Sequence, residues 1–157
     1  MKIDIHDNNT TIYINKVFID FDIKEKTELE RFIMNIVLKL KKKKNNKLSG
    51  FYKAFVYSNN NYGIIIDLIK QDDLDLFPEL IDLKLIIFYD SEIYLKTNDY
   101  FKVKDLNKYY KYSNNYYINI SEINNNELLN LIEFSKIIYG NESYNLKEKL
   151  NIKNINI

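Results

Sequence analysis

The sequence predicts an α+β protein in two similar-sized halves, in which antiparallel β-hairpins are covered by two main amphipathic helices. Short runs of alternating or continuous apolar residues, separated by Asn-rich stretches, predict the hairpins. Two other stretches place apolar residues three and four positions apart, which is the period of an α-helix. The expected order is hairpin, helix, hairpin, then hairpin, hairpin, helix, and this mixture is typical of the α+β class.

The N-terminal half, residues 1–71, is expected to begin with a hairpin followed by an extended segment. Apolar and polar residues alternate from Lys2 to Ile14 on both sides of the turn Asp7-Asn8-Asn9. Asn tolerates the positive φ of tight hairpin turns, so a turn is expected there. Residues 17–23, VFIDFDI, predict a further extended segment whose register is open.

The first helix is expected from Thr27 onward, and it ends in a run of lysines. Thr27 and Glu30 have the spacing of a capping box. Cations in the last turn interact favourably with the negative end of the helix dipole. The apolar stripe of this helix comprises Leu29, Phe32, Ile33, Ile36, Val37 and Leu40.

A phrase that occurs twice predicts two further hairpins. YSNNNYGIIID spans residues 57–67 and YSNNYYINIS spans residues 112–121, each with apolar segments on both sides of the polar run. We interpret the phrase as turn chemistry used twice, and not as a functional repeat. The tyrosines that flank each turn are expected to pair across the strands, Tyr57 with Tyr62 and Tyr112 with Tyr116.

An acidic connector, residues 72–82, is expected between the two halves. It carries the single proline of the chain, Pro78, and its apolar residues have helical spacing, which fits a short broken helix. The second half, residues 83–144, then begins with a hairpin over 83–97 that turns near Asp90-Ser91.

The second helix is expected near the end of this half. Asn126 is placed to cap its N-terminus, with Glu127 in the first turn. Gly140 follows an apolar run and is expected to end the helix, because Gly readily adopts the left-handed conformation found after helix C-termini. The remaining residues, 145–157, predict a polar tail with at most a weak further helix or strand.

The composition argues against several classes of function. The chain has no cysteine and a single histidine, His6, which excludes disulfides and thiolate catalysis and favours a solvated or packed histidine. It also lacks the glycine patterns of phosphate-binding and EF-hand loops. We therefore expect a protein that is not an enzyme, with no catalytic, cofactor-binding or metal-ligating residues.

The chain is expected to be soluble and cytoplasmic. Its N-terminal residues lack the apolar core of a signal peptide, and no apolar stretch reaches the ~18 to 20 residues that span a bilayer. Abundant Lys, Asn, Ile and Tyr beside a single Arg is the composition that an AT-rich genome produces. Much of the apparent low complexity is therefore mutational bias.

The acidic connector is the first candidate binding surface. Its apolar side chains are interleaved with carboxylates, which is the composition of an apolar patch with a charged rim for a protein partner. Alternatively, the same side chains join one half to the other inside the fold. The protein-binding residues expected on the first interpretation are Asp72, Asp73, Leu74, Asp75, Phe77 and Pro78.

A lysine cluster at the end of the first helix supports an alternative function. With Tyr-rich strands, it has the residue types of a protein that binds single-stranded nucleic acid or the ribosome. A solvated helix end explains the same lysines, and a net charge of +1 with one Arg argues against nucleic acid. The nucleic-acid-binding residues of this alternative are Lys41, Lys42, Lys43, Lys44 and Lys47, and the strand residues are Tyr109, Tyr110, Lys111, Tyr116 and Tyr117.

The layout of the chain resembles that of MecA-type adaptor proteins. The N-terminal part of the resemblance consists of IDIHDNNTTIYIN as a hairpin, TELERFIMNIVLKL as a helix and LSGFYKAFVYSNNNYGIIIDLIK as a hairpin. Near the end, KYYKYSNNYYINIS and ELLNLIEFSKIIYG are similar to the late hairpin and helix of that family, with Tyr139-Gly140 after the helix. Together these segments cover most of the chain.

The resemblance rests on the order of elements, and it implies a non-enzymatic adaptor. Members of this family deliver target proteins to a Clp-type AAA+ unfoldase. Their N-terminal domain holds the target, and their C-terminal domain holds the unfoldase. The chain departs from the family by being shorter, by lacking a long charged linker, and by the hairpin expected over residues 83–97.

Overall fold

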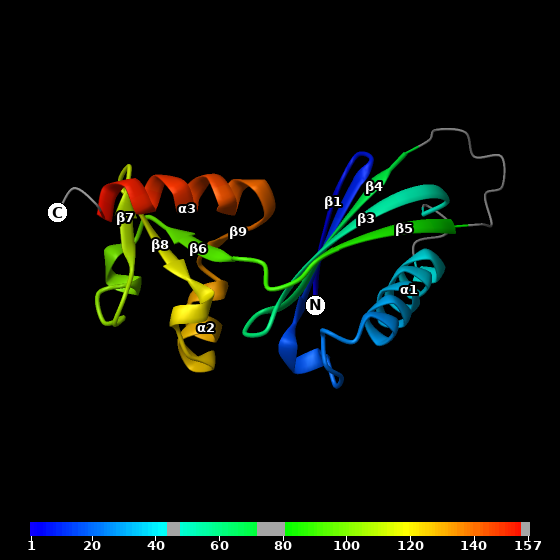
Figure 1. Ribbon diagram of the computed structural model, residues 1–157, viewed down its shortest axis with the longest axis horizontal. Coiled ribbons are helices and arrows are strands. Elements are labelled where there is room, and N and C mark those ends of the chain that lie inside the picture. Colours follow the sequence, from blue (N-terminus) through cyan, green and yellow to red (C-terminus); the bar gives the residue numbers. More distant parts are fainter. Residues whose placement is uncertain (44–47, 72–80, 155–157) are drawn as a thin grey trace. The chain divides into compact units, whose positions relative to one another are not determined.

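The computed structural model describes residues 1–43, 48–71 and 81–154. The chain divides into two compact units, Met1–Asp90 (unit 1) and Ser91–Ile157 (unit 2). Each unit contains one mostly antiparallel β-sheet with helical structure packed against it (Figure 1). The α+β class expected from the sequence is confirmed.

Unit 1 is a five-stranded sheet with one α-helix on one face. The strands lie in the order β1-β2-β4-β3-β5, and all neighbours are antiparallel except β3 and β5, which are parallel. The elements of unit 1 are β1 (Lys2–His6), β2 (Asn9–Asn15), a short 3-10 helix η1 (Lys16–Phe18), α1 (Lys26–Lys43), β3 (Gly50–Asn59), β4 (Gly63–Lys70) and β5 (Ile81–Phe88).

The core of unit 1 forms where the apolar stripe of α1 meets every second residue of the strands. Leu29, Ile33 and Val37 are fully buried, and the expected stripe is thereby confirmed. Side chains alternate between the faces of a strand, so residues two apart share the α1 face. The strand residues of this core include Ile12, Ile14, Ala54, Val56, Ile64, Ile66 and Leu68.

Two local expectations for unit 1 are wrong. The segment 17–23 does not form a strand, because Asn15 Oδ1 accepts a hydrogen bond from Val17 N (3.1 Å) and turns the chain into η1. Thr27 does not cap α1 either, because the helix begins at Lys26 and Leu29 N donates to Glu25 O (3.0 Å). Thr27 therefore lies within the first turn of the helix.

The hairpin expected over residues 83–97 is also wrong. β5 pairs in parallel with β3, with Leu83 beside Tyr52 and Leu85 beside Ala54. This register places the apolar residues of β5 against the core that α1 covers, and the burial outweighs a local turn. Unit 1 therefore extends to Asp90, beyond the boundary at 83 that the sequence suggested.

Unit 2 is a four-stranded antiparallel sheet in the order β7-β8-β6-β9. Helix α3 lies along one face of this sheet (Figure 1) and contributes Leu146 and Leu150 to a core with Tyr94, Tyr117 and Ile138. The elements of unit 2 are β6 (Tyr94–Thr97), η2 (Tyr100–Lys102), β7 (Tyr110–Tyr112), β8 (Asn115–Asn119), η3 (Ile120–Glu122), α2 (Asn125–Ile132), β9 (Lys136–Ile138) and α3 (Gly140–Asn154).

The C-terminal helices differ from those expected. A capping box starts α2 two residues earlier than predicted, with Glu127 N donating to Asn124 Oδ1 (2.9 Å) and Asn124 N to Glu127 Oε2 (2.8 Å). Gly140, at φ 61°, begins α3 and does not end a helix. The expected polar tail thus contains most of α3, whose buried Leu146 and Leu150 are one helical turn apart.

Candidate protein-binding surface

Four aromatic side chains of unit 2 form a partly exposed group, which we call the aromatic cluster. Ring centroids lie 5.7 Å apart for Tyr100 and Tyr116, 5.8 Å for Tyr109 and Tyr116, and 6.4 Å for Tyr100 and Phe101. Tyr100 is 47% exposed and Phe101 is 76% exposed. Such a group of large exposed aromatic side chains is a candidate binding surface.

The backbone around η2 fixes the outward direction of Tyr100 and Phe101. Asp99 Oδ1 caps η2 by accepting a hydrogen bond from Phe101 N (2.9 Å), and Asp99 N donates to Thr97 Oγ1 (3.2 Å). Val103, directly after η2, is fully buried. Because the buried Val103 holds the C-terminal end of η2 in the core, the side chains of Tyr100 and Phe101 face solvent.

The strand β7 is held in place on its other face. The Tyr110 hydroxyl donates to Glu122 Oε1 (3.1 Å), and the Lys108 ammonium pairs with the same carboxylate. The hydrogen bond that Lys108 donates to Glu122 raises the pKa of Lys108. These contacts anchor the residues on both sides of Tyr109 and so fix the position of its ring in the cluster.

Lysine side chains lie against the exposed rings. Lys111 Nζ is 5.7 Å from the ring centroid of Tyr116, and Lys104 Nζ is 5.6 Å from that of Phe101. Lys102 Nζ approaches the ring of Phe134 to 4.0 Å. Cations at these distances are attracted by the negative faces of aromatic rings. Two lysines, Lys104 and Lys111, therefore lie beside rings of the aromatic cluster.

Tyr109 meets two rings of the cluster edge to face. The planes of Tyr109 and Tyr116 are inclined by 75°, as are those of Tyr100 and Tyr109. Packing against these neighbours raises the pKa of Tyr109, with Tyr100 adding to the effect. In this arrangement the rings do not form a row of parallel faces.

The Tyr-rich strands named from the sequence do not form one surface. Lys111 and Tyr116 are cross-strand partners on the exposed side, whereas Tyr110 pairs with Tyr117 on the opposite side. Tyr117 is 7% exposed and belongs to the core beneath α3. The period of two along β7 and β8 explains this division.

The aromatic cluster also contains residues that the sequence reasoning missed. Tyr100 and Phe101 stand in NDYFKVKDLNK, a stretch with neither helical nor strand periodicity. One local pattern in the sequence indicates them: an Asp suited to cap a short turn, followed by two adjacent aromatic residues among lysines.

The lysines named at the end of α1 differ in their exposure to solvent. Lys41 is 8% exposed, whereas Lys42 and Lys43 are exposed. Lys44 and Lys47 lie outside the described residues. The protein-binding residues expected in the acidic connector, Asp72, Asp73, Leu74, Asp75, Phe77 and Pro78, also lie outside the described residues and remain a prediction.

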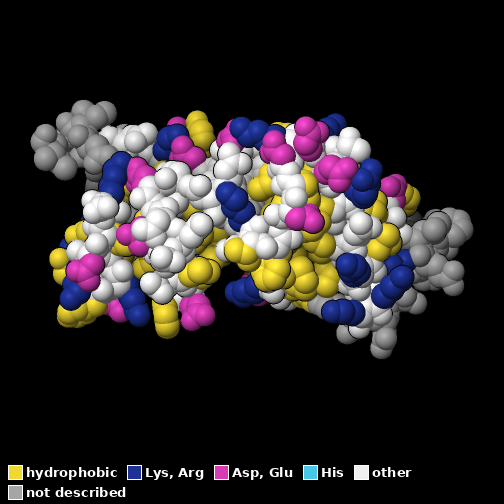
Figure 2. Space-filling view, turned by 90° about the horizontal axis from the view of Figure 1, so that it is seen from below, with side chains coloured by type: hydrophobic (Ala, Val, Ile, Leu, Met, Phe, Trp, Pro, Cys, Tyr) yellow, Lys and Arg dark blue, Asp and Glu magenta, His cyan; other side chains and the backbone are white. Residues whose placement is uncertain are grey.

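Unit 1 carries exposed apolar side chains of its own. Val17 is 75% exposed and Phe18 is 60% exposed on η1. Figure 2 shows apolar side chains gathered at the end of unit 1 that carries η1, with charged side chains around them. Both units therefore present apolar side chains to solvent.

Among the described residues, no group of three or more His, Cys, Asp or Glu side chains is arranged to hold a metal ion. In the same part of the chain, no helix is long and apolar enough to cross a membrane. Comparison with protein-family models, with curated proteins and with solved structures finds no match.

Proposed function

We propose that this protein acts by binding other proteins, and that the aromatic cluster of unit 2 is one contact surface. The observation that supports this is the exposure of Tyr100 and Phe101, whose rings are held outward by a capped turn. Exposed, preorganised aromatic side chains bind with little loss of conformational entropy, and such residues dominate the energetics of many interfaces.

Two separately packed units suit an adaptor that holds two proteins. Unit 2 offers the aromatic cluster, and unit 1 offers Val17 and Phe18. The resemblance to MecA-type adaptors makes a Clp-type AAA+ unfoldase and a target protein the two partners that we propose to test. On this proposal the protein is not an enzyme, and each unit supplies one binding surface.

A second candidate function is binding of single-stranded nucleic acid at the same cluster. It is favoured by Lys104 and Lys111, which lie beside aromatic rings as phosphate-binding lysines do in single-strand binders. The inclination of Tyr109 to its neighbouring rings argues against this function, because successive bases of a single strand stack most readily on ring faces that are roughly parallel to one another. We therefore rank protein binding first.

The proposal is tested by truncating Phe101. We expect Phe101→Ala to lower the recovery of bound partner protein by about tenfold or more, because loss of an interface anchor typically costs ~2 kcal/mol of binding. The thermal unfolding temperature should change little, since the side chain is 76% exposed. The measurement is quantitative mass spectrometry of proteins captured from cell extract by the wild type and by each variant.

Tyr144→Ala is the matched control, because Tyr144 is 64% exposed on α3 of the same unit. A genuine partner is lost with Phe101→Ala and retained with Tyr144→Ala. Replacing Lys102, Lys104 and Lys111 together with Gln distinguishes the two functions. If oligonucleotide binding exists, falls steeply with salt and disappears in this triple variant, nucleic acid replaces protein as the partner of the cluster.

A further inference from the structure

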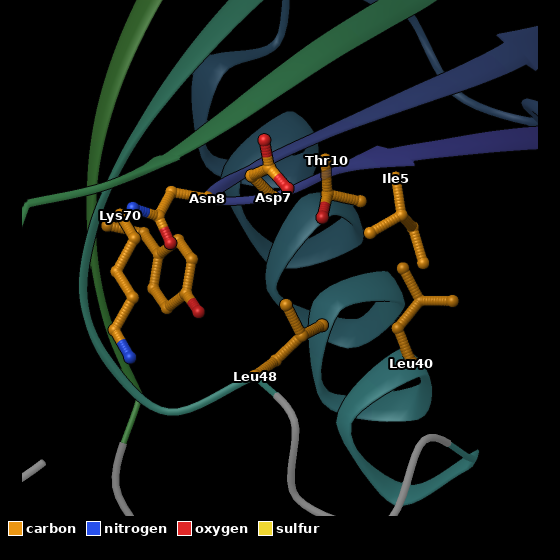
Figure 3. Close-up of a pocket in the computed structure, with 8 residues that line it drawn as sticks. Ile5, Asp7, Asn8, Thr10, Leu40, Leu48 and Lys70 are labelled. Atoms are coloured by element: carbon orange, nitrogen blue, oxygen red, sulfur yellow. The ribbon is translucent and has the colours of Figure 1, made fainter. Parts of the chain in front are cut away.

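Unit 1 contains a cavity of about 300 Å³ at one end of its sheet. It lies between the turn that joins β1 to β2, the C-terminal end of α1 and the ends of β3 and β4 (Figure 3). Ile5, Leu40, Leu48 and Tyr52 supply its apolar walls. The volume is about twice that of a ~150 Å³ protein cavity that binds benzene, so an aryl or branched alkyl group fits.

The hydroxyl group of Thr10, a residue that is itself mostly buried, faces this cavity. Thr10 is 6% exposed and stands in the stripe of β2 that continues with Ile12 and Ile14. Figure 3 shows its side-chain oxygen directed toward the space between Leu40 and Leu48. The next residue, Thr11, donates to Asp67 Oδ1 (2.8 Å), whereas the Thr10 hydroxyl makes no hydrogen bond to a side chain or backbone group of the described residues.

The Thr10 oxygen is open to the cavity and is not a buried atom without a partner. Among the described residues, that condition is found at Ser135 Oγ in unit 2. The Thr10 hydroxyl can therefore bond to water or, in its place, to a ligand.

Charges of both signs line the same cavity. Asp7 contributes an exposed carboxylate from the β1–β2 turn, and Lys70 contributes an ammonium group from the end of β4. Asp7 is held at φ 44°, and Lys70 N donates to Asn8 O (3.1 Å), which ties this turn to β4. Lys70 also keeps contacts of its own. An ammonium has three donors, so it can serve a ligand as well.

We propose that this cavity binds a free α-amino acid with a large apolar side chain, such as phenylalanine or leucine. The side chain enters between Leu40 and Leu48, and the Thr10 hydroxyl hydrogen-bonds to the bound molecule. The α-ammonium group is attracted to Asp7, and the α-carboxylate to Lys70. This site is separate from the aromatic cluster, and the inference does not depend on the protein-binding proposal.

The test titrates the full chain, labelled at Ile and Leu methyl groups, with L-phenylalanine and observes the methyl resonances by NMR. We expect shifts at Ile5, Leu40 and Leu48, with an affinity on the order of 1 mM for a ligand of this size. Glycine, which has the charged head alone, should leave these resonances unchanged. Absence of shifts at these methyl groups overturns the proposal.

Two ligands of similar shape test whether the α-ammonium and α-carboxylate groups contribute to binding. 2-Phenylethylamine lacks the carboxylate and 3-phenylpropanoate lacks the ammonium group, so each should bind about threefold more weakly than phenylalanine. Asp7→Asn should remove the difference between phenylalanine and 3-phenylpropanoate. Asp90→Asn is the matched control, because Asp90 is an exposed aspartate of the same unit at φ 50°. If all three ligands bind equally well to the wild type, the cavity recognises only the hydrocarbon part of the ligand and not its charged groups, and the assignment is overturned.

Thr10→Val tests the hydroxyl that faces the cavity without disturbing the fold, because Val has the same shape and the hydroxyl makes no side-chain hydrogen bond to a described residue. We expect binding of phenylalanine to weaken by about fivefold, which is the typical value of one hydrogen bond. Thermal stability should stay equal or rise. Unchanged affinity in Thr10→Val means that the ligand does not use this hydroxyl, and the proposal fails.

Discussion

The two copies of the Tyr-Ser-Asn-Asn phrase form different turns in unit 1 and unit 2. In unit 1, Asn59 Oδ1 accepts hydrogen bonds from Asn61 N (2.9 Å) and Tyr62 N (3.0 Å), and the hairpin closes at Gly63 with φ 122°. In unit 2, Ser113 and Asn114 take φ 46° and 60° between the paired residues Tyr112 and Asn115, which is a two-residue turn of the primed kind.

One residue accounts for this difference. The first copy contains a glycine, so Gly63 supplies the left-handed conformation and the Asn residues before it remain at negative φ. The second copy has no glycine within the phrase, and its Ser and Asn adopt the left-handed conformation themselves. Shared letters therefore do not mean shared structure, and the phrase is not a structural repeat.

The aromatic pairing expected beside these turns is accordingly wrong. Tyr57 faces Ile65 across the strands and stacks on Phe88 of β5, with ring centroids 5.2 Å apart. In unit 2 the aromatic cross-strand pair is Tyr110 with Tyr117. The turn type sets the register, and the register decides which tyrosines meet.

Replacing Gly63 with Ala is expected to have the largest effect on the comparison. A Cβ atom at this position would lie 2.2 Å from Ile14 O and 2.7 Å from Lys16 N, both of which are backbone atoms. The φ of 122° adds strain for any residue with a Cβ. We expect Gly63→Ala to destabilise unit 1 by more than about 3 kcal/mol, measured by urea unfolding.

Gly140→Ala is the control, because Gly140 at φ 61° lies in the ordinary left-handed region. It should destabilise unit 2 by only about 1 kcal/mol. Similar losses in the two variants would show that conformation alone, and not the close approach of β2, demands glycine at position 63.

The tyrosine after the Asn run gives a second contrast. Tyr62 is 2% exposed, whereas Tyr116 belongs to the exposed aromatic cluster. Burial, with a smaller contribution from Tyr13, raises the pKa of Tyr62 far above its usual value. A raised pKa of this kind stabilises the folded state below the unfolded value of ~10, and the contribution is lost as pH rises above it.

We therefore expect alkaline pH to destabilise unit 1 partly through Tyr62. Above pH ~10 the unfolded chain releases this proton and the folded chain keeps it, so the free energy of unfolding falls by about 1.4 kcal/mol per pH unit for this group. Tyr62→Phe should reduce the slope by that amount in urea unfolding between about pH 10 and pH 11. An unchanged slope would show that Tyr62 does not carry the effect.

Several elements of this fold were predictable because their signal is local. The stripe of α1 repeats over several turns, and the hairpins β1–β2, β3–β4 and β7–β8 have polar turns between alternating strands. Sequence periodicity reports which face of an element is apolar, so Leu29, Ile33 and Val37 could be assigned to the core. It does not report which neighbour covers that face.

The failures arise where a distant neighbour decides the structure. β5 reads as one arm of a hairpin, but its parallel pairing with β3 joins residues such as Leu83 and Tyr52 that are far apart in the chain. α3 was expected as no more than a weak helix or strand in a polar tail, because Leu146 and Leu150 give only a narrow stripe. The aromatic cluster depends on η2, a short turn whose cap at Asp99 carries no periodic signal.

The smallest expected effect distinguishes the two Asn positions by the sign of the change in stability. Asn60 has negative φ, so Asn60→Gly mainly increases the entropy of the unfolded chain and should destabilise unit 1 by about 0.5 kcal/mol. Asn114 has φ 60° at the second position of a primed turn, where Gly is preferred, so Asn114→Gly should stabilise unit 2 by up to about 0.5 kcal/mol. Urea unfolding of both variants gives the two signs, and equal signs would mean that the two turns are alike in solution. Partner capture by both variants should stay within about threefold of the wild type, because each substitution changes a turn and leaves Tyr100 and Phe101 in place.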